Sequence, residues 1–253
     1  MRYKTFLMTE GRSETLHETE AIRLIKENCT VAVKSNLNNK GKIHRGVNNN
    51  ESFLFVDPKS AKPRRSANTK NYYTLLMDNM KSWKKYPKRS ESLICSTNQR
   101  QFGYGFHFVV LPYDNAVLGV ASKQDLWVSF EDIDTRDLSQ FNNNIGTIMR
   151  ELDVSISDSS YLDVLNAFGE FDMSVSDNPE VIDNLINGGI KWLQGYKGDL
   201  LKHMQKLLDP NRNDFELKKI GDKLPKDREV WTDSKCIMVS DRVFDEFIYE
   251  TLK

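Results

Sequence analysis

The chain has 253 residues, of which 39% are hydrophobic, so it is long enough to bury a core as one large domain or two small ones. Its 36 Lys and Arg residues balance 36 Asp and Glu residues, so net charge alone gives no reason to expect a membrane or nucleic-acid partner. The signs are unevenly spread: residues 59–89 hold ten basic residues against one acidic, and residues 131–184 hold thirteen acidic residues against two basic. The basic stretch is either a solvated surface or a face that binds a polyanion.

Cysteines and histidines are scattered along the chain. Cys29, Cys95 and Cys236 are odd in number and lack CxxC spacing, so we expect neither a disulfide framework nor a zinc site, and a reducing cytoplasm as the compartment. The four histidines show no spacing that favours ligation, so we expect no metal. The first residues, MRYKTFLM, hold only a short apolar run, and nowhere do eighteen apolar residues occur together, so we expect neither an export signal nor a membrane span.

The first elements in chain order are a helix and two strands. Residues 13–28, SETLHETEAIRLIKEN, predict an amphipathic helix capped by Ser13. The asparagines of residues 36–39 indicate a loop, and the runs 42–47 and 52–58 predict strands. A second helix is expected over 68–83, where apolar residues recur at helical spacing after a cap at Asn68 or Thr69.

Further along, three β-rich runs at 92–97, 105–113 and 116–122 follow in quick succession and favour a mixed or antiparallel sheet. Residues from about 138 to 207 carry helix-period apolar positions and predict a helical subdomain. Residues 227–240 return to strand character, and 241–253 predict a helix capped by Asp241. The class is therefore α+β, a single domain with a helical insertion at about 138–207.

Polar residues stand at the ends of three expected strands. They are Arg45 and Gly46 in IHRGV, Ser96 and Thr97 in LICSTN, and Asp227 and Glu229 in DREVW. In this order they resemble the arginine, serine and glutamate signature of the ADP-ribosyltransferases. The resemblance covers residues 1–130 and 216–253, and Asn98 stands where the family usually has a second serine. It implies two packed, mostly antiparallel sheets with flanking helices, and NAD as co-substrate.

The resemblance implies a mono-ADP-ribosyltransferase that moves ADP-ribose from NAD to a macromolecule and releases nicotinamide. Arg45 would bind the pyrophosphate bidentately, and Gly46 would let the phosphates approach the backbone. The hydroxyls of Ser96 and Thr97 would hold the ribose and orient Glu229. Glu229 would oppose the positive charge that develops on the ribose as nicotinamide leaves.

Asp227 lies two residues before Glu229, so on a strand both carboxylates would point to one face. The family commonly has Glu or Gln at this position, where it guides the acceptor nucleophile. The shorter Asp227 leaves the modified residue of the acceptor open, and both protein and nucleic acid remain possible acceptors. The alternative to a catalytic role is that Asp227 and Glu229 form a solvent-facing acidic pair on an edge strand. For Arg45, the alternative to phosphate binding is a surface ion pair at the end of a strand.

The loop after Ser96 and Thr97 is rich in aromatics. Phe102, Tyr104 and Phe106 alternate with glycines in FGYGF, and one of them is expected to stack on nicotinamide, although core packing explains aromatics more often. A second hypothesis comes from KPRRSANTKNYY, whose arginines and tyrosines suit single-stranded nucleic acid. On that hypothesis residues 59–89 form a binding module without catalysis. A cytoplasmic transferase would suit a viral protein, a toxin or a bacterial defence system.

Overall fold

The computed structural model describes residues 12–60, 72–101, 105–130, 133, 143–144, 146–147, 179–190, 193 and 200–251. The chain divides into two compact units. Unit 1 comprises residues 1–64, 85–125 and 215–253, and unit 2 comprises residues 65–84 and 126–214. The helical insertion expected at about 138–207 falls within the second stretch of unit 2.

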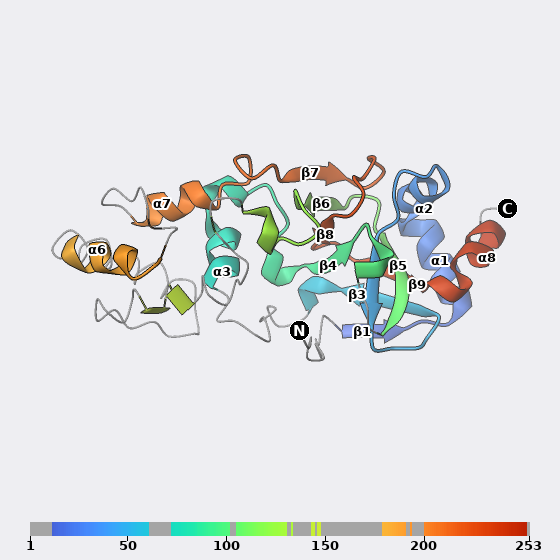
Figure 1. Cartoon of the computed structure of the whole chain (residues 1–253). Helices are drawn as coiled ribbons and strands as arrows, with labels where there is room; N and C mark the ends of the chain where they lie inside the picture. The colour runs from blue at the N-terminus through green and yellow to red at the C-terminus, as the bar shows by residue number, and fades with distance from the viewer. Residues whose placement is uncertain are drawn as a thin grey trace. The chain divides into compact units, whose positions relative to one another are not determined.

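The described part of unit 1 contains nine strands in one antiparallel sheet (Figure 1). Their order across the sheet is β1-β3-β9-β5-β2-β4-β8-β6-β7. In β3, β5, β6 and β8, half or more of the residues are β-branched or aromatic, and such residues favour the pleated conformation. In chain order the strands are β1 (Arg12–Thr15), β2 (His44–Val47), β3 (Phe53–Asp57), β4 (Leu93–Ser96), β5 (Phe106–Pro112), β6 (Val117–Val120), β7 (Glu216–Lys219), β8 (Glu229–Thr232) and β9 (Cys236–Ser240).

The sheet has two halves that meet at β2 and β4. A single residue pair, His44 with Ser96, joins these two strands in the described structure, whereas β2–β5 and β4–β8 each align four residues. One half is therefore β1-β3-β9-β5-β2 and the other is β4-β8-β6-β7. Polar side chains near this pair lie where the two halves of the sheet part.

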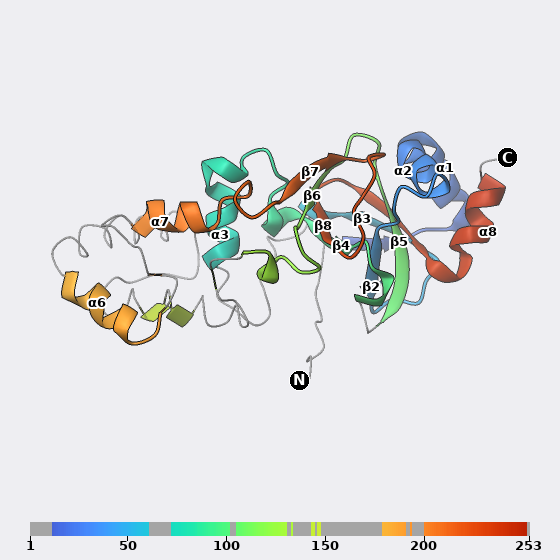
Figure 2. The same ribbon diagram turned by 45° about the horizontal axis from the view of Figure 1, so that its top comes forward.

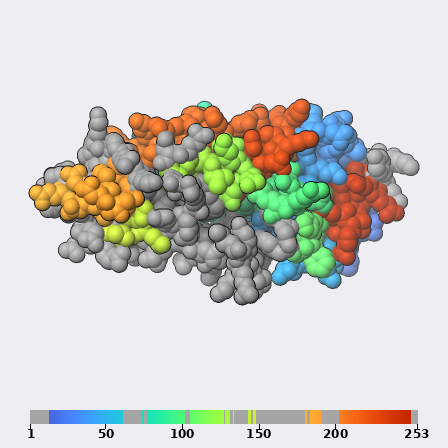
Figure 3. Space-filling view, in the orientation of Figure 1, coloured from blue at the N-terminus to red at the C-terminus, as the bar shows by residue number. Residues whose placement is uncertain are grey.

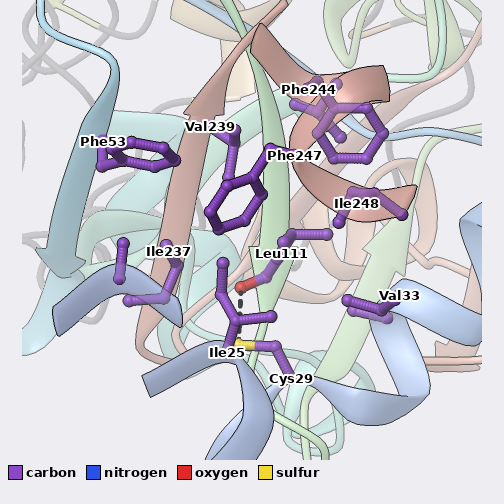
Figure 4. Close-up of a cluster of buried hydrophobic side chains, with 13 residues drawn as sticks. Ile25, Cys29, Val33, Phe53, Leu111, Ile237, Val239, Phe244, Phe247 and Ile248 are labelled. Atoms are coloured by element: carbon purple, nitrogen blue, oxygen red, sulfur yellow. Dashed lines mark hydrogen bonds between the residues drawn. The ribbon is translucent and has the colours of Figure 1, made fainter. Parts of the chain in front are cut away.

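Helices cover one face of the first half. These are α1 (Glu18–Asn28), α2 (Thr30–Leu37) and α8 (Asp241–Thr251), which lie together beside β5 and β9 in two views (Figures 1 and 2). Their apolar faces meet the strands in a buried cluster, in which the rings of Phe53 and Phe247 lie 4.8 Å apart (Figure 4). In the same cluster the Cys29 thiol donates a hydrogen bond to the Leu111 carbonyl at 3.4 Å. Each large side chain buried here stabilises the fold by about 1.5–3 kcal/mol.

The opposite face of the sheet forms a second core. Its described buried residues come from β3, β5 and β9 in one half and from β4, β6 and β8 in the other, joined by Ile43 and Leu224. Because side chains of both halves pack in this one cluster, the two halves cover each other, which requires the sheet to curve. The predicted α+β class is confirmed. Two separate sheets are not: one continuous sheet is present, and its halves close over a common core.

Several expected elements differ from the structure. Ser13 does not cap a helix, because residues 12–15 form β1 and pair with residues 54–57 of β3, and α1 begins only at Glu18. The expected loop at residues 36–39 begins late, because α2 continues to Leu37. Strand β7 was not expected, since its sequence, ELKK, has no β-branched residue. The final helix begins at Asp241, as predicted.

The described residues of unit 2 include three α-helices: α3 (Tyr72–Asn79), α6 (Pro179–Asn187) and α7 (Leu200–Leu207). The expected helix over 68–83 is shorter, since α3 ends at Asn79, and its expected caps Asn68 and Thr69 lie outside the described residues. Trp83 follows α3, and its indole nitrogen donates to the Leu208 carbonyl at 2.7 Å. Met204 of α7 is fully buried.

Figure 3 shows that N-terminal residues, coloured blue, and C-terminal residues, coloured red, lie next to each other on the surface of unit 1. All three cysteines are buried and free. None of the helices in the described ranges is long and apolar enough to cross a membrane.

Candidate functional site

Three polar side chains form a row across the junction of the two halves. His44 of β2 pairs with Ser96 of β4, and Ser96 pairs with Glu229 of β8. Residues directly opposite in antiparallel strands project to the same face, so these three side chains share one face of the sheet. All three are buried. The fold thus brings together three of the polar segments that the sequence singled out.

Ser96 and Thr97 fix the backbone that leads into Glu229. The Thr97 amide donates to the Arg228 carbonyl at 2.9 Å, and the Arg228 amide donates to the Thr97 hydroxyl at 2.9 Å. The Ser96 hydroxyl lies 3.2 Å from the same Arg228 carbonyl and accepts a hydrogen bond from the Asn98 amide at 2.9 Å. It also hydrogen-bonds the side chain of Gln101. Both hydroxyls therefore act on the Glu229 segment through its backbone.

Arg45 projects to the other face. It pairs with Phe108 in the second core, one residue on from His44, and successive strand residues alternate between faces. Its guanidinium is buried and donates from Nη1 to the Ile94 carbonyl at 2.6 Å. Arg45 therefore lies at the junction but on the opposite side of the sheet from Glu229. The plain alternative, a surface ion pair, is wrong for Arg45, because the side chain is buried.

Glu229 has a charged partner that the sequence did not indicate. Arg89 Nη1 lies 2.6 Å from Glu229 Oε1, and the two side chains are only 6% and 8% exposed. The Arg89 guanidinium also lies over the ring of Trp231, 5.6 Å from its centroid. Glu229 and Trp231 are alternate residues of β8 and share a face, so Arg89 contacts both at once. In the sequence, Arg89 was only one of the ten basic residues of 59–89, and nothing marked it as a partner of Glu229.

Asp227 does not share a strand face with Glu229. Strand β8 begins at Glu229, and Asp227 precedes it in a turn with a φ of 54° and an exposed side chain. The alternation argument therefore fails for Asp227, although its carboxylate remains near the start of β8 and open to solvent. Gly46 is buried in β2 opposite His107.

The aromatic loop is only partly described. Phe102 and Tyr104 lie outside the described residues. Phe106 opens β5, is 41% exposed and has the Arg242 guanidinium 5.4 Å from its ring centroid. Gly105 has a φ of 76°, and a Cβ there would lie 2.6 Å from the Val47 carbonyl oxygen, so this glycine is required by the backbone. Phe106 is thus a surface aromatic on unit 1.

A second polar network, not predicted, flanks Ser96. Gln99 donates from Nε2 to Asp241 Oδ2 at 2.6 Å, and Asp241 Oδ1 lies 3.8 Å from His44 Nδ1. Burial lowers the pKa of His44, and the nearby Asp241 carboxylate opposes this shift. Because Asp241 is the first residue of α8, the network ties that helix to the segment after β4. No pattern in the sequence indicated that His44, Gln99 and Asp241 would lie together.

The basic stretch offers less free charge than its composition indicated. Residues 61–71 lie outside the described part, and within that part Lys59 pairs with Asp233 and Lys88 with Glu91. Arg89 is buried against Glu229. Lys81, Lys84 and Lys85 are exposed, and none of them forms an ion pair with another described residue. The described residues thus include both paired and unpaired basic side chains, and they do not decide between a nucleic-acid surface and a solvated one.

At the junction of the sheet halves, one face carries the buried Glu229 carboxylate with the Arg89 guanidinium, and the opposite face carries the Arg45 guanidinium. A buried carboxylate can accept hydrogen bonds from a polyhydroxylated ligand and oppose a developing positive charge, and a guanidinium can bind an anionic group. Within the described ranges, no three His, Cys, Asp or Glu side chains gather in a group that could hold a metal ion. No known protein family, curated protein or solved structure matches the chain, so a function has to be inferred from these side chains.

Proposed function

We propose that the chain is a mono-ADP-ribosyltransferase that moves ADP-ribose from NAD to a macromolecular acceptor and releases nicotinamide. One observation carries the proposal: the segments with Arg45, with Ser96 and Thr97, and with Glu229 lie on the three neighbouring strands β2, β4 and β8. They meet where the two halves of the sheet part, and their order in the sequence is the one that resembles the family signature. We assign the finer fold to the same ADP-ribosyltransferase-like class.

The chemistry assigned to Glu229 follows from its charge and burial. NAD supplies the bond between nicotinamide and ribose, and nicotinamide leaves with the electron pair of that bond as a neutral molecule. Glu229 accepts a hydrogen bond from a ribose hydroxyl and opposes the positive charge that develops on the sugar. Because the Glu229 side chain is only 8% exposed, its carboxylate acts in a medium of low dielectric, where this attraction is stronger than in water.

Ligand binding requires Arg45 to rearrange. Its guanidinium donates to the Ile94 carbonyl and projects from the face of the sheet opposite to Glu229. A pyrophosphate is a better partner for a guanidinium than a neutral carbonyl, since both of its hydrogen bonds are charge-assisted. On this proposal Arg45 releases Ile94 and turns toward the junction of the two halves to bind the pyrophosphate. The exposed Phe106 offers a surface on which a ring of the ligand stacks. Phe102 and Tyr104, which lie outside the described residues, are the other two candidates for the one ring expected to stack on nicotinamide.

The acceptor side is assigned to Asp227. Its exposed carboxylate, two residues before Glu229, guides the incoming nucleophile, which bonds to the ribose carbon and loses a proton to solvent. The acceptor is a protein, with a nucleic acid as the other possibility. Three free cysteines fit a reducing cytoplasm as the site of action.

Replacing Glu229 by Gln tests the proposal most directly. The amide keeps an oxygen that accepts from Arg89 but carries no charge to oppose the developing cation. We expect the rate of nicotinamide release to fall by about 10²–10³-fold, with the NAD dissociation constant within about twofold of the original. Labelled NAD incubated with cell lysate measures transfer, and circular dichroism checks the fold. Release of nicotinamide at the original rate by the folded variant would contradict the role of Glu229.

Arg45 separates binding from catalysis. Replacing Arg45 by Lys keeps the charge but removes the planar fork, so we expect NAD affinity to fall about tenfold, the value of one charge-assisted hydrogen bond. Calorimetric titration with NAD measures this. An unchanged dissociation constant would remove Arg45 from the binding site. If the wild-type protein consumes no NAD and instead binds single-stranded RNA with salt-dependent affinity, the alternative of a non-catalytic binding module replaces this proposal.

A further inference from the structure

The ion pair between Arg89 and Glu229 calls for an explanation of its own. Both side chains are more than nine-tenths buried, and their closest atoms lie 2.6 Å apart. A buried ion pair is weak evidence for stability, because the cost of removing two charges from water offsets much of their attraction. Apolar residues of similar size would fill the same space. The pair is therefore better understood by what it does to the carboxylate.

Arg89 is held from several sides before any ligand binds. It lies two residues after Pro87, whose carbonyl accepts a hydrogen bond from the Trp231 indole at 2.9 Å. The Tyr86 ring stacks on Trp231, and the Tyr86 hydroxyl donates to the Phe215 carbonyl at 3.0 Å. The turn itself is closed by the Ser92 hydroxyl, which donates to the Lys88 carbonyl at 2.7 Å. The guanidinium is thus presented to Glu229 by a fixed segment.

The Glu229 backbone is fixed independently. Its amide donates to the Lys123 carbonyl at 3.3 Å, and its carbonyl accepts from the Ala121 amide at 2.9 Å. Thr97 holds the residue before it. The remaining freedom of Glu229 is in its side-chain rotamers, which a glutamate loses at an entropic cost when it is ordered. Arg89 removes that freedom in the absence of ligand.

We infer that Arg89 is a positioning residue of the reaction: it holds the Glu229 carboxylate in the orientation in which it opposes the charge on the ribose. The inference rests on the proposed function. Arg89 acts through Glu229 and does not bind NAD itself. Its replacement should therefore change the rate of the chemical step, whereas replacement of Arg45 should change the affinity for NAD. Loss of orientation lowers the rate of the chemical step, because a misplaced group stabilises the transition state less, and leaves ground-state binding of NAD intact.

Two variants at position 89 test this. Arg89→Lys keeps the positive charge and loses the planar fork, and Arg89→Gln keeps a donor and loses the charge. Arg23→Gln is the matched control, since Arg23 also pairs with carboxylates, those of Glu20 and Glu27, but on an exposed helix surface. For each protein we would measure kcat and KM for nicotinamide release, the NAD dissociation constant and the melting temperature.

We expect Arg89→Lys to lower kcat by about 10–100-fold, with the NAD dissociation constant within about twofold. The range is taken by analogy from metal sites, where removing a side chain that orients a metal-binding residue lowers activity by about this factor. Arg23→Gln should match the wild type in all four quantities. A kcat within twofold of wild type in either folded Arg89 variant overturns the inference, as does a weaker NAD affinity with unchanged kcat, which would make Arg89 a direct ligand. If neither variant folds, the pair serves stability and the inference fails. Wild-type protein that neither binds nor consumes NAD would instead refute the proposed function.

Discussion

Gly119 is the position where one added methyl group should disturb the candidate site most. It lies on β6 opposite Trp231, and a Cβ there would sit 2.2 Å from Trp231 Cε2 and 2.3 Å from Cζ2. Carbon atoms in contact prefer about 3.5–4.0 Å, so the indole would have to withdraw by more than about 1 Å. Trp231 is fully buried, and the rings of Tyr86 and Phe215 pack beside it.

The cost of Gly119→Ala has two parts. Overpacking a tight core costs about 1–3 kcal/mol. A shift of the indole also strains its hydrogen bond to the Pro87 carbonyl, now 2.9 Å long, and an unsatisfied buried donor costs about 1–3 kcal/mol. We therefore expect the free energy of unfolding to fall by about 2–6 kcal/mol. For a chain of this size that lowers the melting temperature by roughly 5–20 °C.

Urea denaturation followed by fluorescence and circular dichroism measures the loss. Trp231→Leu removes the ring atoms that the new Cβ would meet, so Gly119→Ala should cost at least about 1 kcal/mol less in that background. Gly146→Ala is the control, because nothing lies within 4 Å of a Cβ at that helical position. A cost below about 0.5 kcal/mol, or the same cost in both backgrounds, would refute the steric reasoning.

Two further predictions concern the helix side of the sheet. At the start of α2, the Asp114 carboxylate accepts hydrogen bonds from the Val31 amide and the Thr30 hydroxyl, both at 2.8 Å, so Asp114→Ala should lower the free energy of unfolding by about 1–3 kcal/mol. The control is Asp245→Ala, which breaks an exposed ion pair with Lys42 and should lower it by less than about 1 kcal/mol. Equal losses for the two variants in urea denaturation would contradict the prediction. Burial raises the pKa of Cys29 from 9.0 to about 12, so its contribution to stability is fully present below pH 9 and is lost between about 9 and 12, as the unfolded state ionises first. Cys29→Ala should flatten the decline of unfolding free energy over that range, and an unchanged slope would rule out Cys29 as a cause.

The strands with strong local signals could be predicted from the sequence. Runs such as FLFVD of β3 and CIMVS of β9 are apolar, β-branched and bounded by turn residues, and both form strands near the expected positions. Elements defined by a distant partner could not. Ser13 has the composition of a helix cap, but residues 12–15 pair with residues 54–57, and no local pattern announces that pairing.

The candidate site shows the same division. The segments of Arg45, Ser96 and Glu229 could be chosen from the sequence, because each places polar residues beside an apolar run. Which face each side chain takes could not, since that depends on register: Arg45 pairs with Phe108 and projects away from Glu229. The prediction for Asp227 was wrong because it assumed that Asp227 and Glu229 belong to one strand. Asp227 has a left-handed φ of 54°, and β8 begins only at Glu229. Arg89 was counted with surface charges, although its partner lies far along the chain.

The strand order bears on how the chain is made. The last two strands synthesised, β8 and β9, occupy interior positions, β9 between β3 and β5 and β8 between β4 and β6. Until residues 229–240 leave the ribosome, the four flanking strands each keep an open edge, and open edges pair readily with other chains. A chain ending before residue 229 would therefore lack an interior strand of each half of its sheet, and a premature stop there should yield an aggregating polypeptide instead of a shortened folded protein.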